Sequence, residues 1–185
     1  MRKIILILIS FLPMVSVAQS NTDLLLGLGA SNLGTGDKLI VIIEGEITHK
    51  WNRLLSHSFL LGLGYGDFYS RKIPQPTSDP NSVVYRKKEF EPVFLTHLDA
   101  NLFISPLGND KIYNLKFGTG ASLLYLYDDT SLESEKERLS LGINAIIENE
   151  FRLRNGMLLG LKTMMQPYLN GDINLSILFK VGKEI

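Results

Sequence analysis

The most constraining feature of this sequence is a two-residue alternation, clearest in residues 115–127, LKFGTGASLLYLY. Its odd-numbered positions are mainly apolar and end in aromatics, whereas its even-numbered positions include Lys116, two glycines and Ser122. Successive side chains of a β-strand point to opposite faces, so the pattern predicts a strand with one apolar and one polar face. The stretch is long for a soluble strand and long enough to cross a bilayer at a tilt.

Seven further stretches repeat the alternation, at approximately residues 23–30, 38–48, 58–69, 90–104, 139–153, 157–168 and 172–182. Turn-forming residues separate several of them, including Asn155-Gly156 and Asn170-Gly171. No stretch has a sustained helical period. We therefore predict an all-β fold, a single eight-stranded antiparallel up-and-down transmembrane β-barrel.

The first residues have the composition of an export signal. Arg2 and Lys3 precede an apolar run, and Ser16-Val17-Ala18 supplies small residues where a signal peptidase would cleave. We expect a signal peptide at residues 1–18 and one barrel domain at residues 19–185. Removal of the signal leaves 17 basic residues (19 − 2) against 19 acidic ones. This balance gives no reason to expect nucleic acid as a partner. The absence of cysteine excludes disulfides and a lipoprotein anchor.

The position of the glycines indicates which face of the sheet points inward. Nine glycines share the polar face of their strands, whereas Gly45 alone lies mid-strand on the apolar face. A glycine on a solvent-exposed face only weakens a strand. Inside a narrow barrel, it leaves room for long side chains of neighbouring strands. We therefore expect the apolar face to meet lipid. The inverted alternative is a soluble periplasmic, lipocalin-like barrel that binds an apolar ligand.

The lengths of the connections support the membrane interpretation. The two longest, 70–88 and 128–138, fall on the same end of the predicted barrel, and shorter turns fall on the end that holds both termini. Bacterial outer-membrane barrels have this asymmetry, with short periplasmic turns and longer outer loops. Aromatic belts are expected near both ends, with Tyr65, Tyr69, Tyr125, Tyr127 and Tyr168 on the loop side and Trp51, Tyr113, Phe151 and Phe179 on the turn side.

The inward faces of the predicted strands carry ionisable residues of both signs. Unpaired charge in a poorly hydrated interior is costly, so we expect these residues to pair and to fill the barrel as a structural network. The expected network consists of Glu44, Glu46, His97, Asp99, Lys116, Glu148, Glu150, Arg152, Lys162 and Lys180. For Lys116, the expected partner is Asp99, Glu148 or Glu150. No catalytic, cofactor-binding or metal site is predicted, because no Ser-His-acid set shares the lipid-facing parity.

With a signal that ends in SVA-Q, alternating strands and many GxG steps, the chain resembles the small outer-membrane β-barrel proteins of Bacteroidetes-type bacteria, similar in size to OmpA/OmpX-type barrels. The resemblance implies a bacterial outer-membrane location and contact with outer-membrane lipid, including lipopolysaccharide. We expect a monomer without cofactor or enzymatic activity, in a structural or surface-interaction role with an unidentified extracellular partner. The alternative to a filled barrel is a narrow pore or a transport or sensing barrel.

Overall fold

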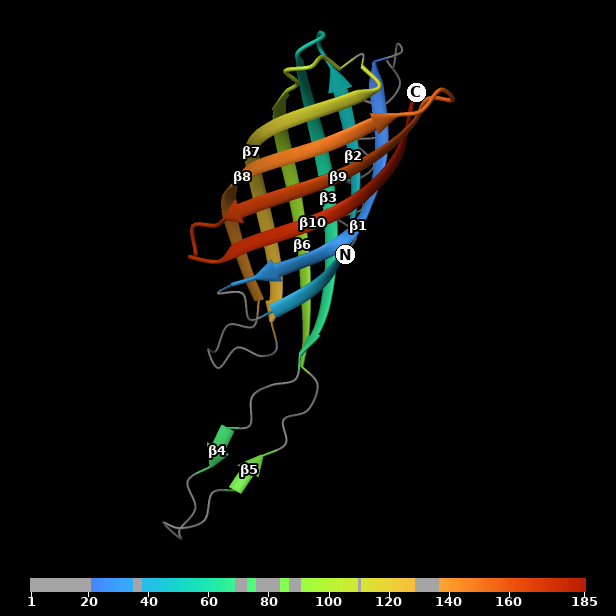
Figure 1. Ribbon diagram of the computed structural model, residues 1–185. Coiled ribbons are helices and arrows are strands. Elements are labelled where there is room, and N and C mark those ends of the chain that lie inside the picture. The colour runs from blue at the N-terminus through green and yellow to red at the C-terminus, as the bar shows by residue number, and fades with distance from the viewer. Residues whose placement is uncertain are drawn as a thin grey trace, which may run out of the picture.

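A computed structural model describes residues 21–34, 38–68, 73–75, 84–86, 91–109, 111–128 and 137–185 of the chain. Eight long strands form a closed barrel in the order β1-β10-β9-β8-β7-β6-β3-β2 (Figure 1). They are β1 (Thr22–Leu33), β2 (Lys38–Lys50), β3 (Leu55–Phe68), β6 (Glu91–Ile104), β7 (Tyr113–Asp128), β8 (Glu137–Arg152), β9 (Met157–Pro167) and β10 (Ile173–Glu184). Every strand pair is antiparallel, and β1 pairs with β10 to close the sheet.

The structure confirms the predicted all-β barrel and its eight strands, and the predicted strand ends agree to within a few residues. The structure adds one feature to the predicted barrel. The connection at 70–88 contains β4 (Ile73–Gln75) and β5 (Val84–Arg86), which pair with each other outside the barrel. Their few residues had no alternation long enough to predict a strand. None of the described residues forms a helix long and apolar enough to cross a membrane.

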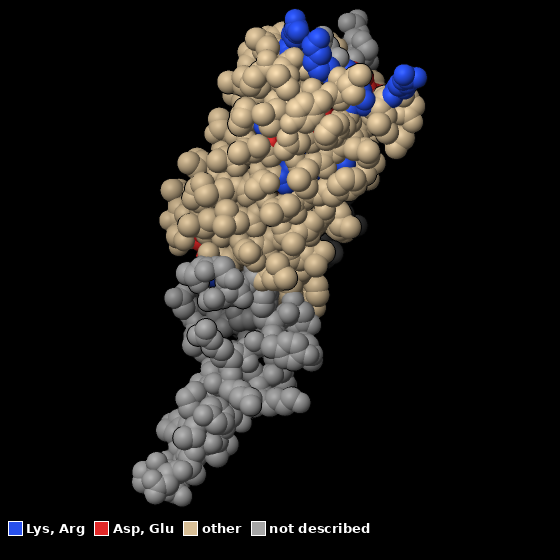
Figure 2. All heavy atoms as spheres, viewed as in Figure 1, with Lys and Arg blue, Asp and Glu red and all other residues tan. Residues whose placement is uncertain are grey.

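The outer wall of the barrel is apolar on every strand, as the glycine argument predicted. Outward-facing side chains such as Leu28, Ile143 and Phe179 are each more than half exposed. The wall in Figure 2 is correspondingly almost free of charged atoms between its two ends. An exposed apolar surface of this extent is incompatible with a water-soluble barrel. The structure therefore contradicts the soluble lipocalin-like alternative.

The inward glycines make room for neighbouring side chains, but only some of these are ionisable. A Cβ atom on Gly62 would lie 1.9 Å from His97 Nε2, and one on Gly27 would lie 3.5 Å from Lys180 Cγ. Other glycines make room for large uncharged side chains, since a Cβ atom on Gly118 would lie 2.5 Å from Phe103 Cε1. The glycines therefore lie on the inward face, as predicted, but only some of them make room for long ionisable side chains.

Most of the aromatic residues expected in the two belts occupy the outer wall near its ends, but Phe179 lies midway along β10, opposite Leu28 of β1. Tyr65 and Tyr125 face outward on the loop side, and Trp51 and Phe151 face outward on the turn side. Tyr168 was expected in the loop-side belt, but its side chain is only 5% exposed and lies inside the barrel. It takes the place that Gly142 leaves, because a Cβ atom there would lie 2.5 Å from Tyr168 Cδ1. Tyr69 lies outside the described residues.

Candidate functional site: the barrel lumen

A row of alternating carboxylates and lysines crosses the middle of the barrel. Lys162 Nζ donates to Glu44 Oε2 at 2.7 Å and to Glu46 Oε2 at 3.4 Å. Lys180 Nζ donates to Glu46 Oε2 at 2.8 Å and to Glu148 Oε2 at 2.7 Å. All five side chains are at most 2% exposed. Each lysine therefore joins two carboxylates, and Glu46 joins the two lysines.

The row continues through Lys116 on β7. Its Nζ atom donates to Glu150 Oε2 at 2.6 Å and lies 3.8 Å from Glu148 Oε1. Glu148 and Glu150 are thus two of the three partners expected for Lys116, whereas Asp99 is not in contact with it. Strand alternation explains the geometry, because Glu148 and Glu150 are two residues apart on β8 and project into the lumen from the same face.

His97 and Asp99 of β6 form the other end of the row. His97 Nδ1 lies 3.0 Å from Asp99 Oδ2, and His97 Nε2 lies 3.6 Å from Glu44 Oε1. Within the described part of the chain, neither His97 Nε2 nor Glu44 Oε1 has a hydrogen-bond partner. Asp99 also accepts hydrogen bonds from Ser122 Oγ at 2.5 Å and from Gln166 Nε2 at 3.0 Å. The charged row thus continues into a network of neutral polar side chains.

Arg152 is the predicted network residue that the structure places elsewhere. It is 21% exposed and lies at the turn-side mouth, where Nη1 is 3.5 Å from Glu184 Oε2 and Nη2 donates to the Asn109 carbonyl at 2.8 Å. A second ion-pair group lies at this mouth, because Lys50 Nζ contacts Asp23 Oδ1 at 2.8 Å and Glu184 Oε1 at 3.1 Å.

Sequence reasoning missed the ionisable residues of this mouth, Asp23, Lys50 and Glu184. The same alternation could have identified Lys50 and Glu184, since each shares a parity with inward residues of its strand. The predicted strands ended at residues 48 and 182, two residues before each of them. Strand ends are the least certain part of such predictions, so the omission of Lys50 and Glu184 follows from the boundaries. Asp23 lay within the predicted strand at 23–30 and on its inward parity, and it was overlooked all the same.

The loop-side part of the lumen is largely apolar, although Asn174 and Gln166 are also buried there, and this corrects the prediction of a polar interior. A buried cluster fills it, composed of Leu33, Ile40, Ile42, Val93, Leu95, Leu124, Leu126, Tyr168 and Leu178. We call this group the apolar seal. Its members share the inward parity of their strands with the charged residues, and six of them are fully buried while the other three are at most 5% exposed. The two-residue alternation predicted that these side chains point inward. It did not predict that the inward side chains change from polar to apolar along the barrel axis.

The lumen contains a serine, a histidine and an aspartate in contact, but their order does not suit nucleophilic catalysis. Ser122 donates to Asp99, and Asp99 contacts His97, so the carboxylate lies between the other two residues. A catalytic serine needs the imidazole beside its hydroxyl, to accept the proton. His97 is also fully buried, away from any substrate. Among the described residues, no group of three His, Cys, Asp or Glu side chains is arranged to hold a metal ion.

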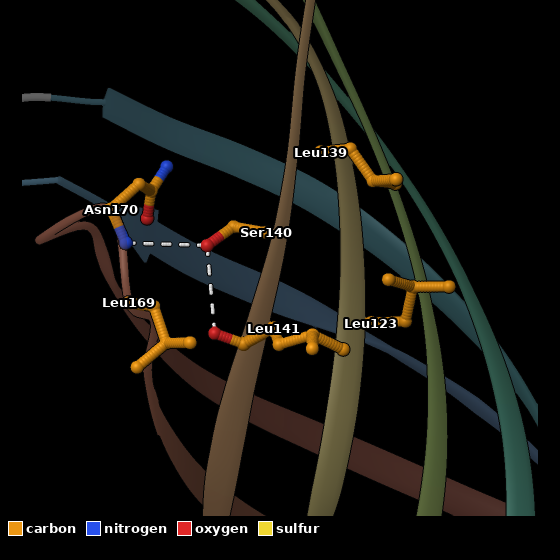
Figure 3. Close-up of a pocket in the computed structure, with 6 residues that line it drawn as sticks. All are labelled: Leu123, Leu139, Ser140, Leu141, Leu169 and Asn170. Carbon is orange, nitrogen blue, oxygen red and sulfur yellow. Dashed lines mark hydrogen bonds between the residues drawn. The ribbon is translucent and has the colours of Figure 1, made fainter.

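A shallow groove of about 520 Å³ lies on the outer wall near the loop end (Figure 3). Leu123, Leu139, Ser140, Leu141, Leu169 and Asn170 line it. The groove arises where the short β9–β10 turn meets β8, with the Leu169 amide donating to the Leu141 carbonyl at 2.8 Å and the Asn170 amide to Ser140 Oγ at 3.3 Å. Its apolar lining continues the lipid-facing wall.

No protein-family model and no curated protein matches the sequence. Solved structures do match the fold. Ail, the attachment invasion locus protein of Yersinia pestis, was crystallised in complex with the heparin analogue sucrose octasulfate; it matches with a TM-score of 0.60 and 8% identity over 90% of this chain and 100% of its own. Neisserial surface protein A matches with a TM-score of 0.61 and 9% identity, covering 89% and 97% of the two chains. The outer membrane enzyme PagL matches with a TM-score of 0.50 and 9% identity, covering 88% and 99%.

At such low identity, these matches concern the fold and carry neither the activity nor the ligands of those proteins. They agree with what the structure shows independently: a closed barrel without free strand edges, whose wall is apolar on all eight strands. Closed barrels of this kind are one of the two structures that can span a bilayer. The apolar wall and the fold together make this chain an eight-stranded β-barrel protein of the bacterial outer membrane.

Proposed function

We propose that this protein is a sealed, monomeric barrel with a structural or surface-interaction role in the outer membrane, and that it does not conduct ions. The single observation that carries the proposal is the two-part filling of its lumen. The turn-side half and the middle contain paired charges, and the loop-side half contains the apolar seal. The expected signal peptide at residues 1–18 would supply the export step.

Neither half of the lumen offers a path to an ion. In the middle, each lysine amine is bound by carboxylates at hydrogen-bonding distance, so a permeating ion would have to break pairs in a poorly hydrated space. In the loop-side half, Ile42, Leu95 and Leu124 are at most 1% exposed and provide no ligand for a dehydrated ion. These features favour the filled barrel over the narrow pore.

Planar-bilayer recording tests this proposal directly. The purified protein, shown to be folded by its heat-modifiable migration on a gel, should insert without steady conductance steps. The triple variant I42A/L95A/L124A removes side-chain volume from the apolar seal. It serves as a control in which conductance is easier to detect. Reproducible wild-type conductance that persists after repurification would refute the sealed-barrel proposal.

A surface-interaction role is favoured by the basic residues of the long connection between β3 and β6, Arg71, Lys72, Arg86, Lys87 and Lys88. We propose that this loop side contacts sulfated or phosphorylated glycans, including lipopolysaccharide. Guanidinium and ammonium groups bind such anions well. The structure of Ail with a sulfated sugar analogue supports this ligand class. Wild-type protein should be retained on immobilised heparin and a variant with all five residues changed to glutamine should not; equal retention of both would contradict the proposal.

A further inference from the structure

The turn end of the barrel presents a repeated pairing of exposed basic and exposed apolar residues. Each of the three turns contributes one such pair: Trp51 with Arg53, Ile112 with Lys111, and Leu153 with Arg154. The end of β10 contributes a fourth, Lys183 with Ile185. We call the basic residues Arg53, Lys111, Arg154 and Lys183 the basic ring. Figure 2 shows lysine and arginine side chains gathered at this end, above an almost uncharged wall.

Few acidic residues offset the ring. Within the described residues, the acids of this end are Asp23, which is buried against Lys50, and Glu184, which contacts Lys50 and Arg152. Asp110 adds one acid to the turn between β6 and β7, but it lies outside the described residues. The exposed residues Lys111, Arg154 and Lys183 therefore outnumber the acids of this end that are not already paired.

A scaffold of hydrogen bonds fixes the turns that carry the ring. Asn109 is only 4% exposed, and its amide donates to the Arg53 carbonyl at 2.7 Å. Its side-chain nitrogen donates to the Asn52 carbonyl at 3.0 Å, and its own carbonyl accepts from Arg152. Asn109 thus ties together elements from three of the turns. The basic side chains project from fixed backbone positions and not from separately moving loops.

The apolar partners indicate what the ring contacts. Ile112 is 77% exposed and Trp51 is 57% exposed, although both lie beside charged residues. The aromatic pair Tyr113–Phe151, with ring centroids 5.0 Å apart, lies at the same end of the wall. Aromatic residues of barrels gather at the boundary between hydrocarbon and headgroups. Basic residues placed there can extend their charged ends to the phosphate level while their stems stay in an apolar environment.

We propose that the basic ring binds the phosphates of anionic phospholipids in the periplasmic leaflet of the outer membrane, and that this lipid shell anchors the turn end. Short turns of outer-membrane barrels face the periplasm, which places the ring in the phospholipid leaflet and away from lipopolysaccharide. Lysine and arginine near an anionic membrane surface attract its headgroups, and the attraction weakens as salt screens it. The inference is independent of whether the lumen conducts ions.

Spin-label resonance tests the proposal in phosphatidylcholine vesicles that contain the folded full chain. Spin-labelled phosphatidylglycerol should associate with the wild-type protein about fivefold more strongly than spin-labelled phosphatidylcholine. The preference should vanish in R53Q/K111Q/R154Q/K183Q. It should also vanish at about 1 M salt, where the screening length is about 3 Å. The matched control is R53K/K111R/R154K/K183R, which changes the same four residues but keeps their charges and should keep the preference. Every protein compared also carries R71Q/K72Q/K87Q/K88Q, so that the basic connection at the opposite end contributes no attraction.

Each result decides the question, provided that every variant migrates as a folded, heat-modifiable species. A wild-type protein without lipid preference would overturn the proposal. So would a ring variant that keeps the preference, or a control variant that loses it equally. A preference that survives high salt would also overturn it, because the recognition would not then be electrostatic.

Discussion

Replacement of Lys180 by methionine tests how much of the barrel's stability depends on the charged row. Lys180 Nζ lies 2.8 Å from Glu46 Oε2 and 2.7 Å from Glu148 Oε2, and its side chain is 1% exposed. The row holds five carboxylates and three lysines, so the variant leaves two lysines for five carboxylates. Methionine keeps most of the volume, so the change removes charge and leaves little cavity.

The expected loss follows from what remains around the two carboxylates. Breaking a buried ion pair by removing one partner typically costs about 3–5 kcal/mol. Glu46 keeps Lys162 at 3.4 Å and Glu148 keeps Lys116 at 3.8 Å, so neither carboxylate is left without a cation. We therefore expect K180M to lower the free energy of unfolding by about 3 kcal/mol, the lower end of that range.

Arg152 provides the control, because its ion pair with Glu184, at 3.5 Å, lies at the mouth. The two side chains are 21% and 27% exposed, so water can solvate the carboxylate left behind. R152M should cost about 1 kcal/mol. Urea titration in phospholipid vesicles, followed by tryptophan fluorescence, would measure both. Equal losses for the two variants, or a K180M loss below about 1 kcal/mol, would refute the view that burial sets the cost.

Three further outcomes follow from the structure. G62A should cost about 1–3 kcal/mol in the same titration, because its Cβ would displace the His97 ring, whereas G45A, with nothing within 4 Å of its Cβ, should be close to neutral; similar losses would contradict the packing argument. N109A should cost about 1–3 kcal/mol by breaking the bonds between turns, and an unchanged unfolding midpoint would speak against that scaffold. I143R should cost about 2–4 kcal/mol in bilayers if Ile143 faces hydrocarbon, and a neutral result would contradict the assigned wall.

The sequence was sufficient to predict the architecture because a two-residue period determines both the strand and its faces. Each strand of the barrel, including the one around Lys116, was recognisable by alternation, and the inward glycines gave its orientation. The short strands β4 and β5 were not predicted, since three residues cannot display a period. Strand pairing and the two-residue alternation determine whether a side chain points into the lumen or outward. They contain no information about the side chains that it meets from strands several positions away in the sheet.

The contents of the lumen were harder to predict for that reason. The partner of Lys180 on β2 is 134 residues away in the sequence, and its identity depends on the register across the seam of the barrel. The apolar seal was overlooked because residues such as Ile42 and Leu124 occur within otherwise polar parities. The Tyr168 side chain lies inside because Gly142, on a different strand, leaves space for it. Each of these outcomes depends on three-dimensional proximity.

The ion pairs that connect β2 with β9 and β10 have a consequence for the order in which the protein folds. Lys180 meets Glu46 and Lys50 meets Glu184, each across 134 residues, and Lys162 meets Glu44 across 118. None of these contacts can form while the sheet is still an open ribbon, however many hairpins are already paired. Contacts so distant in sequence are gained late and together, at the cost of ordering the intervening chain. Assembly should therefore proceed without a stable, partly zipped species, and closure of the seam should be the step at which the barrel becomes resistant to denaturant.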